Sequence, residues 1–157
     1  AGAPVTTPFV LASASPARRT TLRSAGLDPI VIVSGVDESQ LSGLPPAELA
    51  LQLAELKCAA VAERDEVPSD ALVLGCDSVL ELDGEALGKP DDAATAKRRW
   101  QAMRGRSGVL HSGHCLRDVA SGRVAGCART APVRRQNLAW RRGHSTVQSS
   151  TQESASE

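Results

Sequence analysis

The segment at residues 11–19 constrains the fold of this chain most, because it joins an apolar run to the start of an amphipathic helix. Residues 9–11 form the apolar run, Ser15 is a favourable helix N-cap, and Pro16 suits the first helical position, where no N–H is needed. The chain is therefore predicted to leave a strand, turn through small residues and enter a helix. The N–H groups at such a helix start favour a bound anion, so this segment is a candidate phosphate site.

The same segment has a plainer interpretation. Under it, Ser13 and Ser15 only cap the helix, and Arg18 and Arg19 are solvated residues of its first turn. Arginine is slightly unfavourable at a helix N-terminus, and a visiting anion would remove that penalty. Both interpretations stay open on this segment alone.

Apolar runs alternate with helical patterns along the chain, which predicts an α/β or mixed α+β fold. The 157 residues suffice for one domain whose core is built from Leu, Val and Ala, because aromatic residues make up only 2%. Strands are expected at residues 8–12, 29–33, 72–76, 79–82, 109–119 and 123–128, and helices at 16–25, 45–64 and 91–103.

The character of the sequence changes after about residue 130. Residues 131–157 contain paired arginines and a run of Ser, Thr and Gln, with no helical or strand period. We expect residues 1–130 to form the domain and residues 131–157 to be a disordered tail. The tail arginines would suit nucleic acid, but the zero net charge of the chain argues against such a partner.

The four cysteines form no Cys-x-x-Cys pair, which is typical of reduced thiols in a cytoplasmic protein. No apolar run approaches the length of about 18 residues that a membrane span needs, so no membrane partner is expected. Four histidine and cysteine residues could be proposed as a structural zinc site, but side chains that alternate along a strand would not all lie on one face. These residues are His111, His114, Cys115 and Cys127.

Four polar groups stand where predicted elements begin, end or are interrupted. Asp77-Ser78 follows the apolar run at residues 72–76, and ligands bind outside the carboxyl ends of strands in open sheets. Asp77 is therefore placed to hold a metal or to take a proton from water. Each of these groups, considered alone, also has an interpretation without any function, as a strand-end cap, a solvent-facing lysine or an ordinary loop. The groups are Asp37-Glu38, Lys57, Asp77-Ser78 and Gly88-Lys89-Pro90.

Together these residues resemble the Maf family of nucleoside triphosphate pyrophosphatases. The order and spacing of six segments carry the resemblance, which covers about residues 8–130 and looks most like actinobacterial members. The segments are LASASPARR (11–19), AGL (25–27), VDE (36–38), LAELKCA (53–59), LGCDSVLELDGEALGKP (74–90) and MRGRSGVLHSGHC (103–115).

The resemblance implies a Maf/inosine-triphosphatase-like fold and a cytoplasmic enzyme. It would hydrolyse a nucleoside triphosphate to the monophosphate and diphosphate with Mg²⁺ or Mn²⁺, clear non-standard nucleotides, and form a homodimer. Asp77 matches the family's catalytic acidic residue, its proton acceptor, and shares the expected metal site with Glu38. Phosphate binding is expected at Ser13, Ser15, Arg18, Lys57 and Lys89.

The sequence departs from the family pattern in two ways. Ala17 stands where many members have Arg, and Ser78 where many have Thr. The resemblance implies that both positions influence the choice of base and that dTTP and UTP are favoured. The family's C-terminal half is also expected to be missing here, with a frameshift near residues 130–133. The alternative to an enzyme is then an inactive fragment that retains at most phosphate binding.

Overall fold

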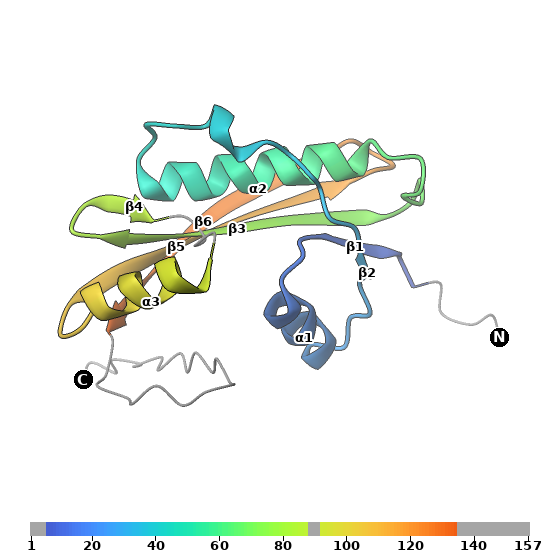
Figure 1. Cartoon of the computed structure of the whole chain (residues 1–157). Coiled ribbons are helices and arrows are strands. Elements are labelled where there is room, and N and C mark those ends of the chain that lie inside the picture. Colours follow the sequence, from blue (N-terminus) through green and yellow to red (C-terminus); the bar gives the residue numbers. More distant parts are fainter. Residues whose placement is uncertain (1–5, 88–91, 135–157) are drawn as a thin grey trace, which may run out of the picture.

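The computed structural model describes residues 6–87 and 92–134, which form a mixed β-sheet with α-helices on both sides (Figure 1). The sheet order is β2-β1-β3-β5-β6, and β4 pairs with β3 beside this path. The strands are β1 (Phe9–Ala12), β2 (Ile30–Val31), β3 (Leu72–Leu82), β4 (Glu85–Leu87), β5 (Ser107–Asp118) and β6 (Val124–Arg134). The helices are α1 (Pro16–Ser24), α2 (Pro46–Ala62) and α3 (Ala93–Ala102), with a 3₁₀ turn at Glu38–Gln40. The mixed α/β architecture predicted from the sequence is confirmed.

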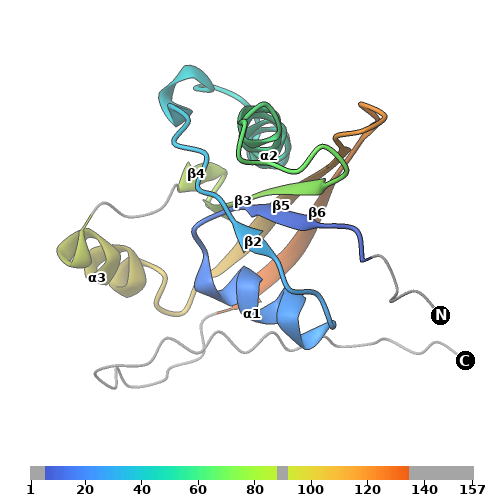
Figure 2. The ribbon, with the colours of Figure 1, turned by 90° about the vertical axis from the view of Figure 1, so that its right-hand side faces the viewer.

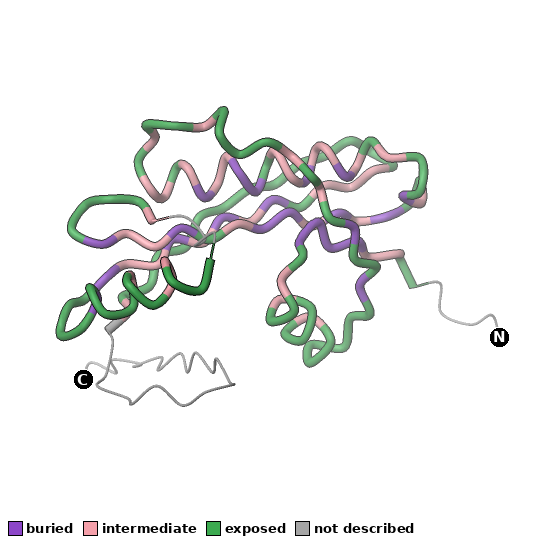
Figure 3. Tube along the Cα trace, viewed as in Figure 1, coloured by how far each residue is buried: buried purple, intermediate pink, exposed green. Residues whose placement is uncertain are grey.

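Helix α2 covers one face of the sheet, whereas α1 and α3 lie toward the other side (Figure 2). Two glycines let α2 lie close, because a Cβ at Gly75 would be 2.2 Å from the Ala54 carbonyl oxygen and one at Gly113 2.1 Å from that of Ala50. The core forms between α2 and the strands, and α1 and α3 bury no residue completely (Figure 3).

One edge of β3 is left open in its middle. β1 pairs in parallel with residues 72–75 of β3, and β4 pairs antiparallel with residues 80–82. Since β5 occupies the opposite edge over residues 72–81, β1 and β4 must share the first edge. Among the described residues, no strand pairs with residues 76–79 on that side, so their backbone groups and side chains border the space between β1 and β4.

The strand predicted at residues 72–76 was too short. Residues 72–82 form one strand, and Asp77 and Ser78 lie in its middle rather than at a carboxyl end. The continuous ladder with β5 carries the backbone through these polar residues, and their side chains project from opposite faces of the sheet, Asp77 toward Lys57 and Ser78 toward Arg18. It is β1 that ends beside them, at Ala12.

Two other strand boundaries differ from expectation. β2 contains only Ile30 and Val31, because β1 is its partner and pairs with it at two positions. β6 extends to Arg134, and so continues past the position at which the tail was predicted to begin. The remainder of the predicted tail, residues 135–157, lies outside the described residues, and the domain boundary stays a prediction. None of the described helices has the length and apolar character needed to span a bilayer.

Candidate active site

A cavity of about 950 Å³ borders the open edge of β3. Its polar wall comes from the segment between β1 and α1, from α1, the 3₁₀ turn, α2 and the middle of β3. Its apolar wall comes from β4, from α3 and the residue after it, and from neighbouring parts of β3 and β5. The polar wall contains Ser13, Ser15, Arg18, Glu38, Lys57, Asp77 and Ser78. The apolar wall contains Leu80, Leu87, Ala96, Trp100, Met103 and Leu110.

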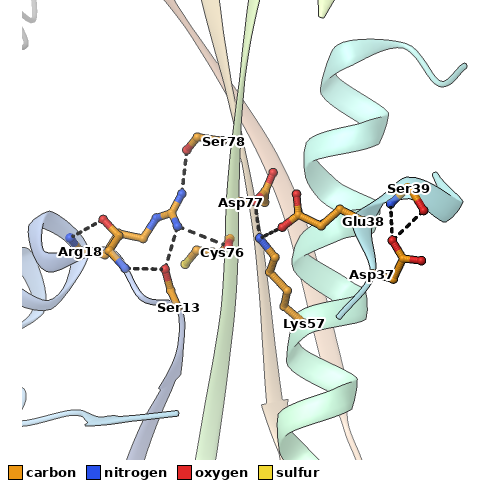
Figure 4. Close-up of polar contacts among 10 residues, drawn as sticks. Ser13, Arg18, Asp37, Glu38, Ser39, Lys57, Cys76, Asp77 and Ser78 are labelled. Carbon is orange, nitrogen blue, oxygen red and sulfur yellow. Dashed lines mark hydrogen bonds and ion pairs between the residues drawn. The ribbon is translucent and has the colours of Figure 1, made fainter. Parts of the chain in front are cut away.

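Lys57 joins two carboxylates on one side of β3 (Figure 4). Its Nζ lies 2.6 Å from Asp77 Oδ1 and 2.7 Å from Glu38 Oε1. The Lys57 and Asp77 side chains are only 15% and 14% exposed, whereas Glu38 is 54% exposed. Lys57 therefore does not lie on a solvated helix face, and it brings together α2, β3 and the 3₁₀ turn.

This arrangement shifts the pKa values of both Lys57 and Asp77, which are largely but not completely buried. Burial lowers the pKa of Lys57, but the hydrogen bonds and charges of Asp77 and Glu38 outweigh burial and raise it above 10.5. Burial raises the pKa of Asp77 above 3.8, although Lys57 opposes this rise. Asp77 is thus a stronger base than an ordinary aspartate, held beside an ammonium whose own pKa is raised.

Arg18 approaches β3 from the other side, where three contacts fix its guanidinium (Figure 4). Nη1 donates to Ser13 Oγ at 2.8 Å and to the Cys76 carbonyl oxygen at 3.4 Å, and Nη2 donates to Ser78 Oγ at 2.9 Å. The Cys76 carbonyl can accept this bond because it belongs to the open segment of β3. The remaining N–H groups of the guanidinium are left for an anionic ligand.

The hydroxyls of Ser13 and Ser15 are used differently from each other. Ser15 caps α1 by accepting the Arg18 backbone N–H at 3.4 Å, as predicted. Ser13 Oγ accepts from both Arg18 Nη1 and the Ser15 backbone N–H, the latter at 3.3 Å. Since both lone pairs of Ser13 Oγ are engaged, its proton is available to a phosphate oxygen.

The other predicted site residues are placed unevenly. Ser78 lies on the cavity wall, but Ala17 is exposed in the first turn of α1 and is not among the lining residues. Lys89 lies outside the described residues. Sequence reasoning did not find Ser112, whose Oγ lies 3.1 Å from Ser78 Oγ, or Trp100 on the apolar wall. The alternation of apolar and polar residues along β5 was visible in the sequence, but the pairing register that places Ser112 opposite Ser78 was not.

A profile of the family described as Maf-like protein matches residues 8–154. The chain belongs to the Maf family. A Maf relative from Streptomyces avermitilis, named nucleoside triphosphate pyrophosphatase, is 62% identical over 126 residues, 80% of this chain and 61% of that protein. Another of that name, from Salinispora tropica, is 60% identical over 119 residues, 74% of this chain and 53% of that protein. The chain thus spans between 53% and 61% of the length of these curated Maf relatives.

The fold of this Maf chain is also similar to that of solved structures with low sequence identity. A HAM1 protein from Coxiella burnetii superposes with a TM-score of 0.54 at 17% identity, over 81% of this chain and 72% of that one. The Ham1 protein of Staphylococcus aureus superposes with a TM-score of 0.52 at 18% identity, over 80% of this chain and 70% of that one. The predicted Maf/inosine-triphosphatase-like architecture agrees with these neighbours.

Two carboxylates of the Maf site form a candidate site for a divalent metal. No group of three or more His, Cys, Asp and Glu side chains suited to a metal occurs within residues 6–87 and 92–134. Asp77 and Glu38 nevertheless converge on one cationic nitrogen. Two carboxylates, completed by water and phosphate oxygens, are a donor set that Mg²⁺ accepts, so the residues fit such an ion.

The zinc alternative is not supported by the geometry. His111 pairs with Glu81, with Nε2 2.6 Å from Oε2, while His114 lies opposite Cys127 in the ladder of β5 and β6. Because side chains alternate along β5, His111 and His114 point to opposite faces of the sheet. The four residues therefore do not converge.

Proposed function

We propose that this chain carries the pyrophosphatase site of a Maf enzyme, which hydrolyses a nucleoside triphosphate to the monophosphate and diphosphate. The observation that carries the proposal is the Lys57–Asp77 pair, 2.6 Å apart and largely buried on the wall of a cavity that also contains Arg18. Hydrolysis of a phosphoanhydride needs a general base that activates water and donors that stabilise the phosphate oxygens, and this cavity contains both kinds of group. The names of the Maf relatives support the same activity.

In the proposed reaction, Arg18 and the Ser13 hydroxyl bind phosphate oxygens at the N-terminal end of α1. Lys57 holds Asp77 through Oδ1, which leaves Oδ2 to accept a proton from the attacking water. The water oxygen bonds to phosphorus as the bond between the α- and β-phosphates breaks, and the leaving diphosphate takes the electron pair. Lys57 and Arg18 stabilise the charge that develops on the phosphate oxygens.

Glu38 and Asp77 Oδ1, which has a second lone pair besides the one that accepts from Lys57, would hold the metal that the family resemblance implies, so Oδ2 would stay available for the proton. Bound Mg²⁺ or Mn²⁺ would neutralise phosphate charge and polarise the phosphoryl oxygens. We propose that the substrate is a cytoplasmic nucleotide, with Ala17 and Ser78 influencing the choice of base. Clearance of non-standard nucleotides, homodimer formation and phosphate binding by Lys89 belong to the same proposal.

The product pair tests which phosphoanhydride bond is cleaved. The purified chain is incubated with each of the common ribonucleoside and deoxyribonucleoside triphosphates in Mg²⁺ or Mn²⁺, and the products are identified by ³¹P NMR. The proposal predicts a monophosphate and diphosphate from at least one nucleotide. Release of inorganic phosphate with a nucleoside diphosphate would contradict it. No product from any nucleotide would instead favour a fragment limited to phosphate binding.

A further inference from the structure

Two serine hydroxyls connect Arg18 to the interior of the sheet. Ser78 in β3 lies directly opposite Ser112 in β5, and their Oγ atoms are 3.1 Å apart. Asp77, the neighbour of Ser78, points toward Lys57 on α2, so alternation places Ser78 and Ser112 on the opposite face. Arg18 reaches Ser78 on that face, with Nη2 2.9 Å from Oγ.

The direction of the hydrogen bond between Arg18 and Ser78 follows from the chemistry of the two groups. A guanidinium only donates, so Ser78 Oγ must accept from Arg18. Either serine can donate in the second bond, and the Ser78 proton is free to take the donor role toward Ser112 Oγ. Donation of this proton makes Ser78 Oγ a better acceptor for the guanidinium, because consecutive hydrogen bonds polarise one another.

Ser112 is better protected than the serine that it contacts. Ser78 is exposed, and a serine hydroxyl on an exposed strand position exchanges among staggered rotamers and water partners. Ser112 is half-buried within the long ladder that β5 forms with β3 and β6. It therefore offers Ser78 a fixed partner on the side away from Arg18.

We propose that Ser112 is a positioning residue that orients the Arg18 guanidinium through Ser78. Ser13 and the Cys76 carbonyl hold Nη1, and the two serines hold Nη2, so both ends of the guanidinium plane are fixed. The remaining N–H groups then face the phosphates of the substrate. This inference rests on the proposed function for the role of Arg18, and it gives Ser78 a second role besides base choice.

Binding of inorganic pyrophosphate tests the proposal without turnover. Calorimetry is performed on the wild-type chain, Ser112→Ala, Ser112→Thr and a matched control, Ser107→Ala, which changes an exposed serine of the same strand. Loss of one hydrogen bond in such a network is expected to weaken binding about 3- to 10-fold in Ser112→Ala. Ser112→Thr retains the hydroxyl and should bind pyrophosphate as tightly as the wild type. Ser107→Ala should also leave the affinity unchanged.

A double-mutant cycle separates positioning from a general effect on the sheet. In a Ser78→Ala background the connection to Arg18 is already lost, so Ser112→Ala should weaken pyrophosphate binding no further. Additive losses, or equal losses in Ser112→Ala and Ser107→Ala, would overturn the proposal. Thermal denaturation of each variant identifies any that fails to fold.

A spectroscopic measurement tests, in the ligand-free protein, whether Ser112 orients the Arg18 guanidinium. Rotation of the Arg18 guanidinium about its Cζ–N bonds, followed by ¹⁵N NMR, should be faster in Ser112→Ala than in the wild type and unchanged in Ser107→Ala. Unchanged rotation in Ser112→Ala would overturn the proposal. If positioning is observed but no nucleotide is hydrolysed, the proposed function fails alone; if Ser112→Ala changes nothing while hydrolysis proceeds, this inference fails alone.

Discussion

Lys57 Nζ lies 2.6 Å from Asp77 Oδ1, across the boundary between α2 and the open edge of β3. The close approach of α2 at Gly75, two residues before Asp77, makes this contact possible. Glu38 contacts the same ammonium from the 3₁₀ turn, so Lys57 pairs with one largely buried and one exposed carboxylate. The pair is thus both a structural connection and the centre of the proposed chemistry.

Replacement of Lys57 should raise the pKa of Asp77 further. Burial raises this pKa, and the hydrogen bond and charge of Lys57 oppose it, so Lys57→Met leaves burial less opposed. A ¹³C NMR titration of the Asp77 carboxyl measures the change, with exposed Lys97→Met as the control. An unchanged or lower pKa in Lys57→Met would show that the ammonium does not act on Asp77. In the proposed reaction, the variant should also lower kcat by about 10²–10³-fold.

Ionisation of Asp77 should reduce the stability of the fold. Because its pKa in the folded chain lies above the ordinary 3.8, the folded state retains this proton to higher pH than the unfolded state. The contribution of Asp77 to stability is therefore present below pH 3.8 and is lost as the pH rises through the raised pKa. Urea unfolding across this range should show the wild-type free energy of unfolding falling relative to that of Asp77→Asn. A relative rise with pH would contradict the direction of the shift.

A methyl group at Gly75 should separate α2 from the sheet. Its Cβ would lie 2.2 Å from the Ala54 carbonyl oxygen and 2.7 Å from Cys58 Cβ, so the helix must move. Overpacking of this kind typically costs about 1–3 kcal/mol, and the Lys57–Asp77 contact should lengthen with it. At Gly126 a Cβ would meet the flexible Glu55 side chain at 3.1 Å, so Gly126→Ala is the control. Chemical denaturation should separate the two variants; equal stabilities would contradict this account of α2 packing.

Thiol reactivity should distinguish one cysteine from the other three. Cys127 is exposed, whereas Cys58, Cys76 and Cys115 are buried. Burial raises the pKa of all three buried thiols, that of Cys115 to about 12. A chromogenic disulfide reagent near neutral pH should therefore modify one thiol rapidly in the folded chain and all four after denaturation. Rapid modification of Cys58 or Cys115 in the folded state would contradict the packing of α2 on the sheet, whereas rapid modification of Cys76 would contradict its burial on the opposite face.

Local sequence signals predicted the helices well, because caps and turn residues act over a few positions. Ser15 caps α1, Gly26 follows it with a φ of +86°, and Asp83-Gly84 forms the predicted turn between β3 and β4. The length of β3 could not be predicted in the same way. Asp77 and Ser78 interrupt its apolar pattern, and their place within a strand depends on the distant partner β5.

The membership of the site was more predictable than its geometry. The sequence proposed Arg18 at a helix start, Lys57 inside an apolar helix and Asp77 at a strand end as separate groups, and the structure brings them to one cavity. Arg18 and Lys57 approach β3 from opposite sides, because the side chains of Asp77 and Ser78 alternate between the two faces of the sheet. The sequence did not show that these two residues lie within a strand. The role of Ser112 depended on the register of β5 against β3, since its contact is with Ser78 in another strand.

The central claim is that Asp77 acts as the base at the open edge of β3. Its most direct test is the rate of pyrophosphate release by the wild-type chain, by Asp77→Asn, and by Asp65→Asn, which removes an exposed carboxylate elsewhere. The account predicts release by the wild type and Asp65→Asn at the same rate, and a loss of about 10²–10⁴-fold in Asp77→Asn, which removes a general base. Release by Asp77→Asn at the wild-type rate would contradict it.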